Sequence, residues 1–547
     1  MLLRNIFLKS IRDNQAGLLA WGGGIALLTA AGASQYPLVI SGTGAERARM
    51  AAEVAKVFQA FSFLMGEITA LDTIGGFLTT RVISFVPVMM SLWVAVIAVG
   101  LIRGEEQQGA LDMLLSTPHS RQSVIKQKAS ALVVIILIAN FLVGIGMLLG
   151  IILAGEPVPA GEVVLAMLNI AVLVGFWGAV GLLVGQFVLT RRTASSITGA
   201  LIFGTFLLNN VLGGIPSLSW LTWLLPFHYF TASKPLVPGR GMDWAAWSVL
   251  LVLTAGLTIL SALVFSRRDI GSTFRLFSLR SQGAKATGGS MRLLTSLFSK
   301  STRDLLGSMV GWSAGLGLFA LMIVTTAKEA LEPIRQVMSN TPLFKALFGS
   351  ITTYESYISI AFFTYFPVLL VVFSIVQVGE WSSDEEEGRM ELTAAMPLPR
   401  WQLMAARYVG IVLSLLVMLL VISASLILGA AISGISLDPG HVWQALAASL
   451  PLALVVAAFG LCIATWLKRP GAAMPLTIAV VVAMFFLELF APFLGLPEAA
   501  LNLSIFHLYG NPMVAGIEWG GMLALIAATL ILGAGSLIGL NKRDIAK

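Results

Sequence analysis

The chain has 547 residues, of which 57% are hydrophobic and 11% charged, and its mean hydropathy is +0.90. Soluble domains carry about 25% charged residues, so this composition excludes an ordinary soluble domain. The single cysteine, Cys462, excludes a disulfide framework or a thiolate metal site built within the chain, and the four histidines lie in no metal-ligand spacing. No alternating strand pattern occurs, so membrane-crossing segments are helices. We predict an all-α polytopic membrane protein.

Twelve apolar stretches follow one another along the chain, each close to the ~20 residues that a helix needs to cross a bilayer. In the first half they cover residues 17–38, 82–102, 129–153, 163–189, 195–214 and 244–265. In the second half they cover residues 308–326, 358–379, 408–433, 443–467, 473–491 and 519–540. We therefore expect about 12 transmembrane helices, six in each half.

The second half repeats the first at a nearly constant offset. Residues 279 positions apart match, as in Gly109 and Gly388, Pro118 and Pro397, Arg121 and Arg400, and His228 and His507. The halves also end alike, with "RRDI" at 267–270 and "KRDI" at 542–545. Because six is an even number, both halves enter the membrane from the same side and form parallel six-helix repeats. We assign 1–270 to the first repeat, 271–291 to a basic linker and 292–547 to the second repeat.

The N-terminus is basic and then apolar, a pattern also found in signal peptides. The same pattern returns in mid-chain: Lys9, Arg12, Asp13 and Trp21 match Lys300, Arg303, Asp304 and Trp312, each 291 residues later. A signal peptide would not be repeated internally, so we expect this segment to remain as part of the first span.

Most lysines and arginines fall in the loops on one side of the predicted spans, and loops 154–162 and 434–442 on the other side have none. The positive-inside rule therefore places both termini and the basic linker in the cytosol. The linker's charge suits an anionic inner leaflet. We expect no nucleic-acid partner, because neither a recognition fold nor a set of stacking aromatic residues accompanies the charge.

Two polar patches interrupt the apolar sequence, "GEEQQGALDMLLSTPHSR" at 104–121 and "DEEEGRMELTAAMPLPR" at 384–400. Both lie in the loop between the second and third spans of their half. The first patch predicts one amphipathic helix of about 13 residues. Its apolar stripe is Leu111, Leu114 and Leu115, with Asp112 on the polar side; in the second patch Met390, Thr393 and Ala394 take the stripe positions and Glu391 replaces the aspartate. A solvated interfacial turn is the alternative, but the repetition favours two symmetric docking sites for a two-fold cytosolic partner.

These patches resemble a pattern of known permeases, E-x-x-x-G-x-L-[DE]-x-L-L-x-x-P-x-x-R. The first copy has Glu105, Gly109, Leu111, Asp112, Leu114, Leu115, Pro118 and Arg121, and the second has Asp384, Gly388, Glu391, Pro397 and Arg400. The family is that of the second class of ATP-binding-cassette (ABC) exporter permeases, which share the fold of the ABCG transporters. Over essentially its whole length, the chain looks most similar to fused bacterial exporters of drugs or polyketide antibiotics. The second copy departs from the pattern at polar Thr393 and in its longer acidic run.

The resemblance implies that each patch is a coupling helix that seats in a nucleotide-binding subunit. The coupling residues would be Glu105, Glu106, Gly109, Asp112, Arg121, Glu385, Glu386, Gly388, Glu391 and Arg400. No Gly-Lys dipeptide occurs, so the chain has no phosphate-binding loop and is not itself an ATPase. It would bind no cofactor, and two copies of a separate cytosolic ABC ATPase would hold ATP and magnesium. The expected function is export of lipophilic or amphipathic small molecules across the bacterial inner (plasma) membrane.

In this family the second and fifth spans line the pathway, and elbow helices precede each first span. In the second span, Phe85, Met89 and Trp93 share one helix face. A helix-packing or lipid-facing stripe would look the same. In the fifth spans, Asn209 and Asn210 of the first half and Glu488 of the second are further candidates, and Glu488 stands 279 residues after Asn209.

A secondary, ion-coupled multidrug transporter is the alternative function. Such transporters need acidic residues within the membrane, and Glu488 is nearly the only one here. A membrane enzyme is a third class, but no paired carboxylates, nucleophile elbow or metal cluster supports it.

The charge distribution makes a testable prediction about topology. In a Cys462→Ala background, Ala160→Cys and Pro439→Cys should react with a membrane-impermeant maleimide in intact cells, because their loops lack positive charge. Ser281→Cys, in the basic linker, should react only after the cells are opened. Labelling of Ser281→Cys in intact cells would reverse the assignment.

Overall fold

The computed structural model describes residues 5–40, 42–60, 65–188, 190–213, 217–269, 297–340, 353–386, 388, 390–391, 399–467, 470–494, 498–513 and 516–543. The chain forms two compact units, Met1–Gln282 and Gly283–Lys547. Within the described ranges the regular elements are helices, and one isolated β-bridge joins Lys234 and Gly241.

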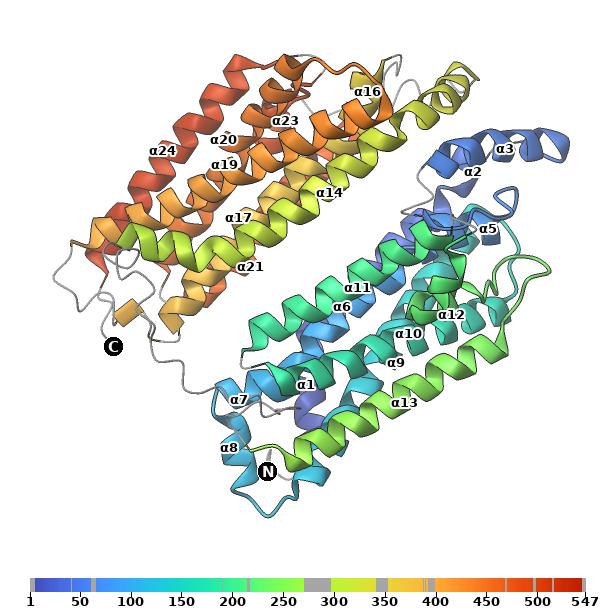
Figure 1. The fold of residues 1–547 in the computed structure, drawn as a ribbon, viewed down its shortest axis with the longest axis horizontal. Coiled ribbons are helices and arrows are strands. Elements are labelled where there is room, and N and C mark those ends of the chain that lie inside the picture. The colour runs from blue at the N-terminus through green and yellow to red at the C-terminus, as the bar shows by residue number, and fades with distance from the viewer. Residues whose placement is uncertain are drawn as a thin grey trace. The chain divides into compact units, whose positions relative to one another are not determined.

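Unit 1 consists of long helices with short ones at both ends (Figure 1). The long helices are α1 (Ile6–Ser34), α6 (Val86–Val99), α9 (Arg121–Ala154), α10 (Ala160–Phe187), α11 (Arg191–Gly213) and α13 (Trp244–Arg267). Near the N-terminus lie α7 (Glu105–Gln107) and α8 (Ala110–Leu115), and at the opposite end lie α2 (Tyr36–Val39), α3 (Ala45–Ala60) and α5 (Ile74–Leu78). The remaining elements are the π-helices η2 (Thr79–Ile83) and η3 (Gly100–Gly104), η4 (Ser219–Leu224) and α12 (Pro226–Thr231).

Unit 2 repeats this order of elements. Its long helices are α14 (Leu297–Asn340), α17 (Phe366–Glu386), α19 (Arg400–Ser433), α20 (Pro439–Trp466), α21 (Ala473–Leu494) and α24 (Trp519–Lys542). Its short elements are α16 (Tyr354–Ile358), the π-helix η6 (Ser359–Phe363), η7 (Pro470–Ala472), α22 (Glu498–Leu501) and α23 (Ile505–Tyr509).

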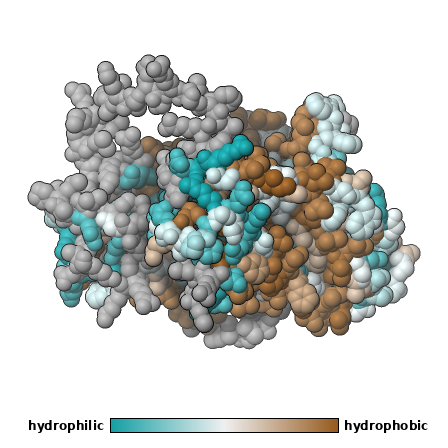
Figure 2. Space-filling view, turned by 90° about the horizontal axis from the view of Figure 1, so that it is seen from below, coloured by the Kyte–Doolittle hydropathy of each residue, from teal (hydrophilic) through white to brown (hydrophobic). Residues whose placement is uncertain are grey.

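The described residues form eleven helices that are long and apolar enough to cross a membrane. They overlap all the predicted spans except 473–491, which lies in the 22-residue helix α21. Figure 2 shows apolar side chains forming a band on the visible face, with hydrophilic side chains gathered beside it. The prediction of an all-α polytopic membrane protein is confirmed.

Two local features differ from the sequence-based expectations. The elbow helices expected before the first spans are continuous with those spans, in α1 and α14. The second span is broken in both units, because a π-helix and a two-residue turn precede α6 and α17. Pro87 and Pro367 sit in the first turns of these helices, where the missing N–H of proline leaves no helical hydrogen bond unmade.

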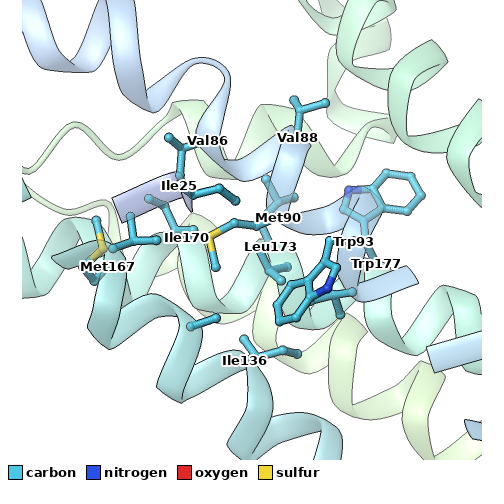
Figure 3. Packing of buried hydrophobic residues seen from close by; sticks show 14 of the residues in the cluster. Ile25, Val86, Val88, Met90, Trp93, Ile136, Met167, Ile170, Leu173 and Trp177 are labelled. Atoms are coloured by element: carbon cyan, nitrogen blue, oxygen red, sulfur yellow. The ribbon is translucent and has the colours of Figure 1, made fainter. Parts of the chain in front are cut away.

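The core of unit 1 surrounds α6. Figure 3 shows side chains of α6 packed among those of α1, α9 and α10, with Met90 and Trp93 contributed by α6 and Trp177 by α10. By contrast, α13 exposes large apolar side chains such as Val252 and Ile259. In a membrane such side chains face lipid, so α6 is an internal helix and α13 a peripheral one.

Helices α1 and α9 approach each other through small residues. A Cβ atom at Gly146 would overlap the carbonyl oxygen of Ala26, and one at Gly150 would lie 2.6 Å from the Cβ of Ala33. Close packing through glycine and alanine is typical of helix pairs in membranes, where hydrophobicity alone does not drive association.

This contact predicts that Gly146→Ala destabilises unit 1 by about 1–3 kcal/mol, because the added methyl group meets backbone that cannot move aside. Gly161→Ala is the matched control, since a Cβ there meets nothing within 4 Å. Thermal unfolding of the purified protein in detergent should show a lower midpoint for Gly146→Ala alone. Equal midpoints for the two variants would contradict the packing argument.

Candidate functional site

The first polar patch forms two short helices, α7 and α8, joined at Gly109. Gly109 has φ +70°, a left-handed conformation that other residues adopt at a cost of about 1–2 kcal/mol. The prediction of one 13-residue helix was therefore wrong, because this glycine ends α7. The predicted stripe is confirmed: Leu111 and Leu114 are buried, while Asp112 and Met113 are exposed.

The second patch repeats this geometry where the structure describes it. Gly388 has φ +72°, Met390 is buried and Glu391 is exposed. Three residues of the predicted patch, Thr393, Ala394 and Pro397, lie outside the described residues, as does the side chain of Glu386. In both units a left-handed glycine thus precedes an apolar side chain that packs inward and an acid that points outward.

Glu106 lies in a buried cluster rather than on the surface. Its Oε2 atom is 3.0 Å from Nη1 of Arg103 and 2.6 Å from Nη2 of Arg268, and all three side chains are at most 4% exposed. Arg121, the first residue of α9, donates a hydrogen bond from Nη1 to the carbonyl oxygen of Arg268. Arg103 also donates from Nε to the carbonyl oxygen of Gly185 at 3.0 Å.

Unit 2 contains the same cluster. Nη2 of Arg543 is 2.7 Å from Oε1 of Glu385, and Nη1 of Arg400 donates to the carbonyl oxygen of Arg543 at 2.5 Å. Nη1 of Arg543 donates to the carbonyl oxygen of Ala464 at 2.6 Å. Ala464 stands 279 residues after Gly185, as Glu385 does after Glu106. We call each cluster an arginine junction: Arg103, Arg121, Arg268 and Glu106 in unit 1, and Arg400, Arg543 and Glu385 in unit 2.

Glu105 joins a second set of buried contacts. Its carboxylate lies 2.5 Å from Nζ of Lys128, which is fully buried in α9, and 3.3 Å from Nζ of Lys9. In unit 2, Arg407 takes the place of Lys128 and pairs at 3.2 Å with Glu380, which is one helical turn earlier than the position of Glu105. Each unit therefore fixes its second span to its third through a buried cation.

These contacts change the interpretation of the acidic residues. The sequence suggested that Glu105, Glu106 and Asp112 form one surface, but the side chains of Glu105 and Glu106 are only 15% and 4% exposed. Asp112 alone of the three faces outward. Sequence reasoning also missed Arg103, Arg268 and Arg543, although the repeated "RRDI" and "KRDI" signal pointed to the last two.

The predicted pathway residues do not form one open face. Phe85 lies in the turn before α6, with its ring centroid 6.5 Å from that of Phe206 in α11. Met89 is half-buried, whereas Trp93 is 7% exposed and packs in the core (Figure 3). Trp93 thus occupies a packing position, and contact of Phe85 and Met89 with a substrate stays a prediction.

The polar pathway candidates lie in the fifth spans. Asn209 is buried and Asn210 is half-buried. Glu488 is 38% exposed and pairs with His507, whose Nδ1 atom is 3.5 Å from Oε1. In unit 1, His228 instead bonds Thr222, with Nδ1 to Oγ1 at 2.9 Å. Both repeated histidines therefore have intramolecular partners.

No group of three or more histidine, cysteine, aspartate or glutamate side chains is placed to hold a metal ion in the described part of the chain.

Comparison with known families assigns both units. Residues 4–270 match the family described as ABC-2 family transporter protein. Residues 294–540 match the family described as multidrug efflux system permease Rv1217c, C-terminal domain. No curated protein matches the chain. The two matches together span both apolar helical units, and the chain is an ABC-2 type permease, the transport subunit of an ABC transporter in the membrane.

Proposed function

We propose that the chain is the permease of an ATP-driven exporter, working with two copies of a separately encoded cytosolic ABC ATPase. ATP and magnesium would bind only to that partner. The cargo would be lipophilic or amphipathic compounds of antibiotic or drug type, moved out across the bacterial plasma membrane.

The repeated surface helix carries this proposal. In each unit a left-handed glycine turns a short segment outward, an apolar residue anchors it, and an acid faces solvent: Asp112 in unit 1 and Glu391 in unit 2. One chain thus presents two matching contact points, which suits a partner present in two copies. The short helices α7 and α8 lie at the same end of unit 1 as the N-terminus (Figure 1), in keeping with a cytosolic N-terminus.

A cavity in unit 2 supports a lipophilic cargo. It has a volume of about 320 Å³ and lies between α17, α21 and α23. Its lining is wholly apolar and includes Val372, Val482, Phe485 and Phe506. Small-molecule sites typically occupy about 300–1,000 Å³ and are mostly apolar. The cavity also lies within the unit that matches a multidrug efflux permease.

A difference between the repeats gives a physical reason for the cavity. In unit 1, α11 carries Gly199, and Leu92 of α6 comes within 3.5 Å of the position that a Cβ would take there. The matching residue of α21 is Ile478, which lines the cavity. We infer that this branched side chain, in place of a hydrogen atom, prevents the second and fifth spans from packing closely at this point and so leaves the space.

The surface helices predict a coupling defect without unfolding. Asp112→Lys and Glu391→Lys should abolish most substrate-stimulated ATP hydrolysis when the permease is reconstituted with its ATPase, because each reverses a charge at the contact. Exposed charges contribute about 0–1 kcal/mol to stability, so the unfolding midpoint should hardly change. Glu46→Lys makes the same change on exposed residue 46 of α3, at the other end of unit 1, and should leave coupling intact. Wild-type stimulation in both coupling variants would argue for a merely interfacial segment.

The cavity predicts a specific loss of affinity. Val482→Phe should raise the KM for efflux of a neutral lipophilic dye such as Nile red by about tenfold, since the ring fills space that the dye would occupy. Val252→Phe is the matched control, because Val252 is 69% exposed on α13 and lies away from the cavity. A similar KM for the two variants would place the dye elsewhere.

A further inference from the structure

The arginine junctions connect four helices of each unit at one point. In unit 1 the contacts join the segment leading into α7, the start of α9, the end of α10 and the end of α13. In unit 2 they join the ends of α17, α20 and α24 with the start of α19. The central residues, Arg268 and Arg543, are the residues that cap the C-termini of α13 and α24.

The junction of unit 1 is buried, with its charged side chains at most 4% exposed, and that of unit 2 is mostly buried, with Arg543 and Glu385 17% and 15% exposed. Removing one partner of a buried ion pair leaves an uncompensated charge, and such losses are far larger than those of exposed pairs. The guanidinium groups at the ends of α13 and α24 also interact favourably with the negative C-terminal end of a helix. The junction is therefore a firm attachment at the end of an otherwise peripheral helix.

We propose that the arginine junction makes the last span of each repeat move with the coupling segment during the ATP-driven stroke. Arg268 and Arg543 are the positioning residues for this motion. A force applied by the ATPase at α8 reaches Glu106 within a few residues of chain, and the pair with Arg268 passes it to α13. Arg121 transmits it to α9 through the carbonyl group of the same residue. The inference rests on the proposed function, because it assigns a path to the coupling step.

The two junctions differ in one respect. In unit 1 two arginines make the contacts: Arg268 pairs with Glu106, and Arg103 donates a hydrogen bond to the carbonyl group of Gly185. In unit 2, Arg543 alone both pairs with Glu385 and reaches the carbonyl group of Ala464. Residue 382, which matches Arg103, is serine. The loss of a guanidinium fork is therefore expected to matter more at Arg543 than at Arg268.

Lysine substitution tests this difference, since lysine keeps the positive charge but lacks the two-pronged geometry of arginine. Arg543→Lys should lower the number of substrate molecules transported per ATP by about tenfold, the effect of one lost charge-assisted hydrogen bond. Arg268→Lys should lower it much less. Arg240→Lys is the control, because Arg240 is 60% exposed and lies outside the junctions. Thermal midpoints measured in parallel should stay at the wild-type value for Arg240→Lys and fall somewhat for Arg543→Lys, which keeps its charge but loses one hydrogen bond.

A second measurement leaves the junction unchanged and so avoids a folding defect. Spin labels at Met113 of α8 and Leu263 of α13, both exposed, report the distance between the coupling segment and the last span of unit 1. With the ATPase bound, this distance should be the same before and after trapping with ATP and vanadate. A change in the wild-type distance on trapping would overturn the proposal.

The outcomes also separate this inference from the proposed function. If the wild-type chain and its ATPase show no ATP-dependent transport, the exporter assignment fails. If the wild type transports but Arg543→Lys couples transport to ATP as well as Arg240→Lys does, the exporter assignment stands and the role of the junction is refuted.

Discussion

The cost of an unpaired charge in a dry environment governs the end of unit 1 that carries α7 and α8. Glu106, Arg268 and Lys128 are removed from water, whereas Glu385 of unit 2 is 15% exposed; each of the four has an oppositely charged partner within 2.5–3.0 Å. Without those partners each charge would cost several kcal/mol, so the helices that carry them are fixed in position relative to one another. These ion pairs form a rigid polar base at one end of the unit. The apolar helices extend from this base, and the surface helix α8 lies next to it.

The two repeats keep this base while varying its parts. Lys128 becomes Arg407, and its acidic partner moves one turn along the second span. Two arginines of unit 1 are replaced by a single arginine in unit 2. Away from the base, Gly199 becomes Ile478 beside the apolar cavity. Joining both repeats in one chain allows such differences, since a substitution in one copy leaves the other copy unchanged.

The sequence predicted well whatever depends on local composition. Apolar stretches identified the spans because bilayer thickness sets their length, and the repeat offset located the two polar patches that each contain a left-handed glycine. The sequence-based predictions were wrong where contacts with residues far away in the chain determine whether a side chain is buried. The acids at 105 and 106 look exposed in a polar stretch, yet Glu106 pairs with Arg268, which is 162 residues away, as well as with the nearby Arg103. Phe85, Met89 and Trp93 do follow one another along the start of α6, but the neighbouring helices bury Trp93 in the core, which the sequence of one span does not show. Pro87 and Pro367 mark where α6 and α17 begin, but nothing in the local sequence announced the π-helix that breaks each second span before them.

The π-helices at Thr79–Ile83 and Ser359–Phe363 create that break in both units. A π-turn holds about one residue more than an α-turn, and one residue corresponds to about 100° of rotation around a helix axis. The second span thus consists of two helical segments, one before and one after the π-helix, and the inserted residue sets the rotation of one about the span axis relative to the other. Deleting one residue of the π-helix would rotate the following helix, α6 or α17, by more than a quarter of a turn relative to the segment before it. The side chains that now face the core would then face lipid. The rotation of α6 and α17 about their axes therefore depends on the π-helix. The number of residues in the π-helix is as constrained as the identity of any side chain in the span.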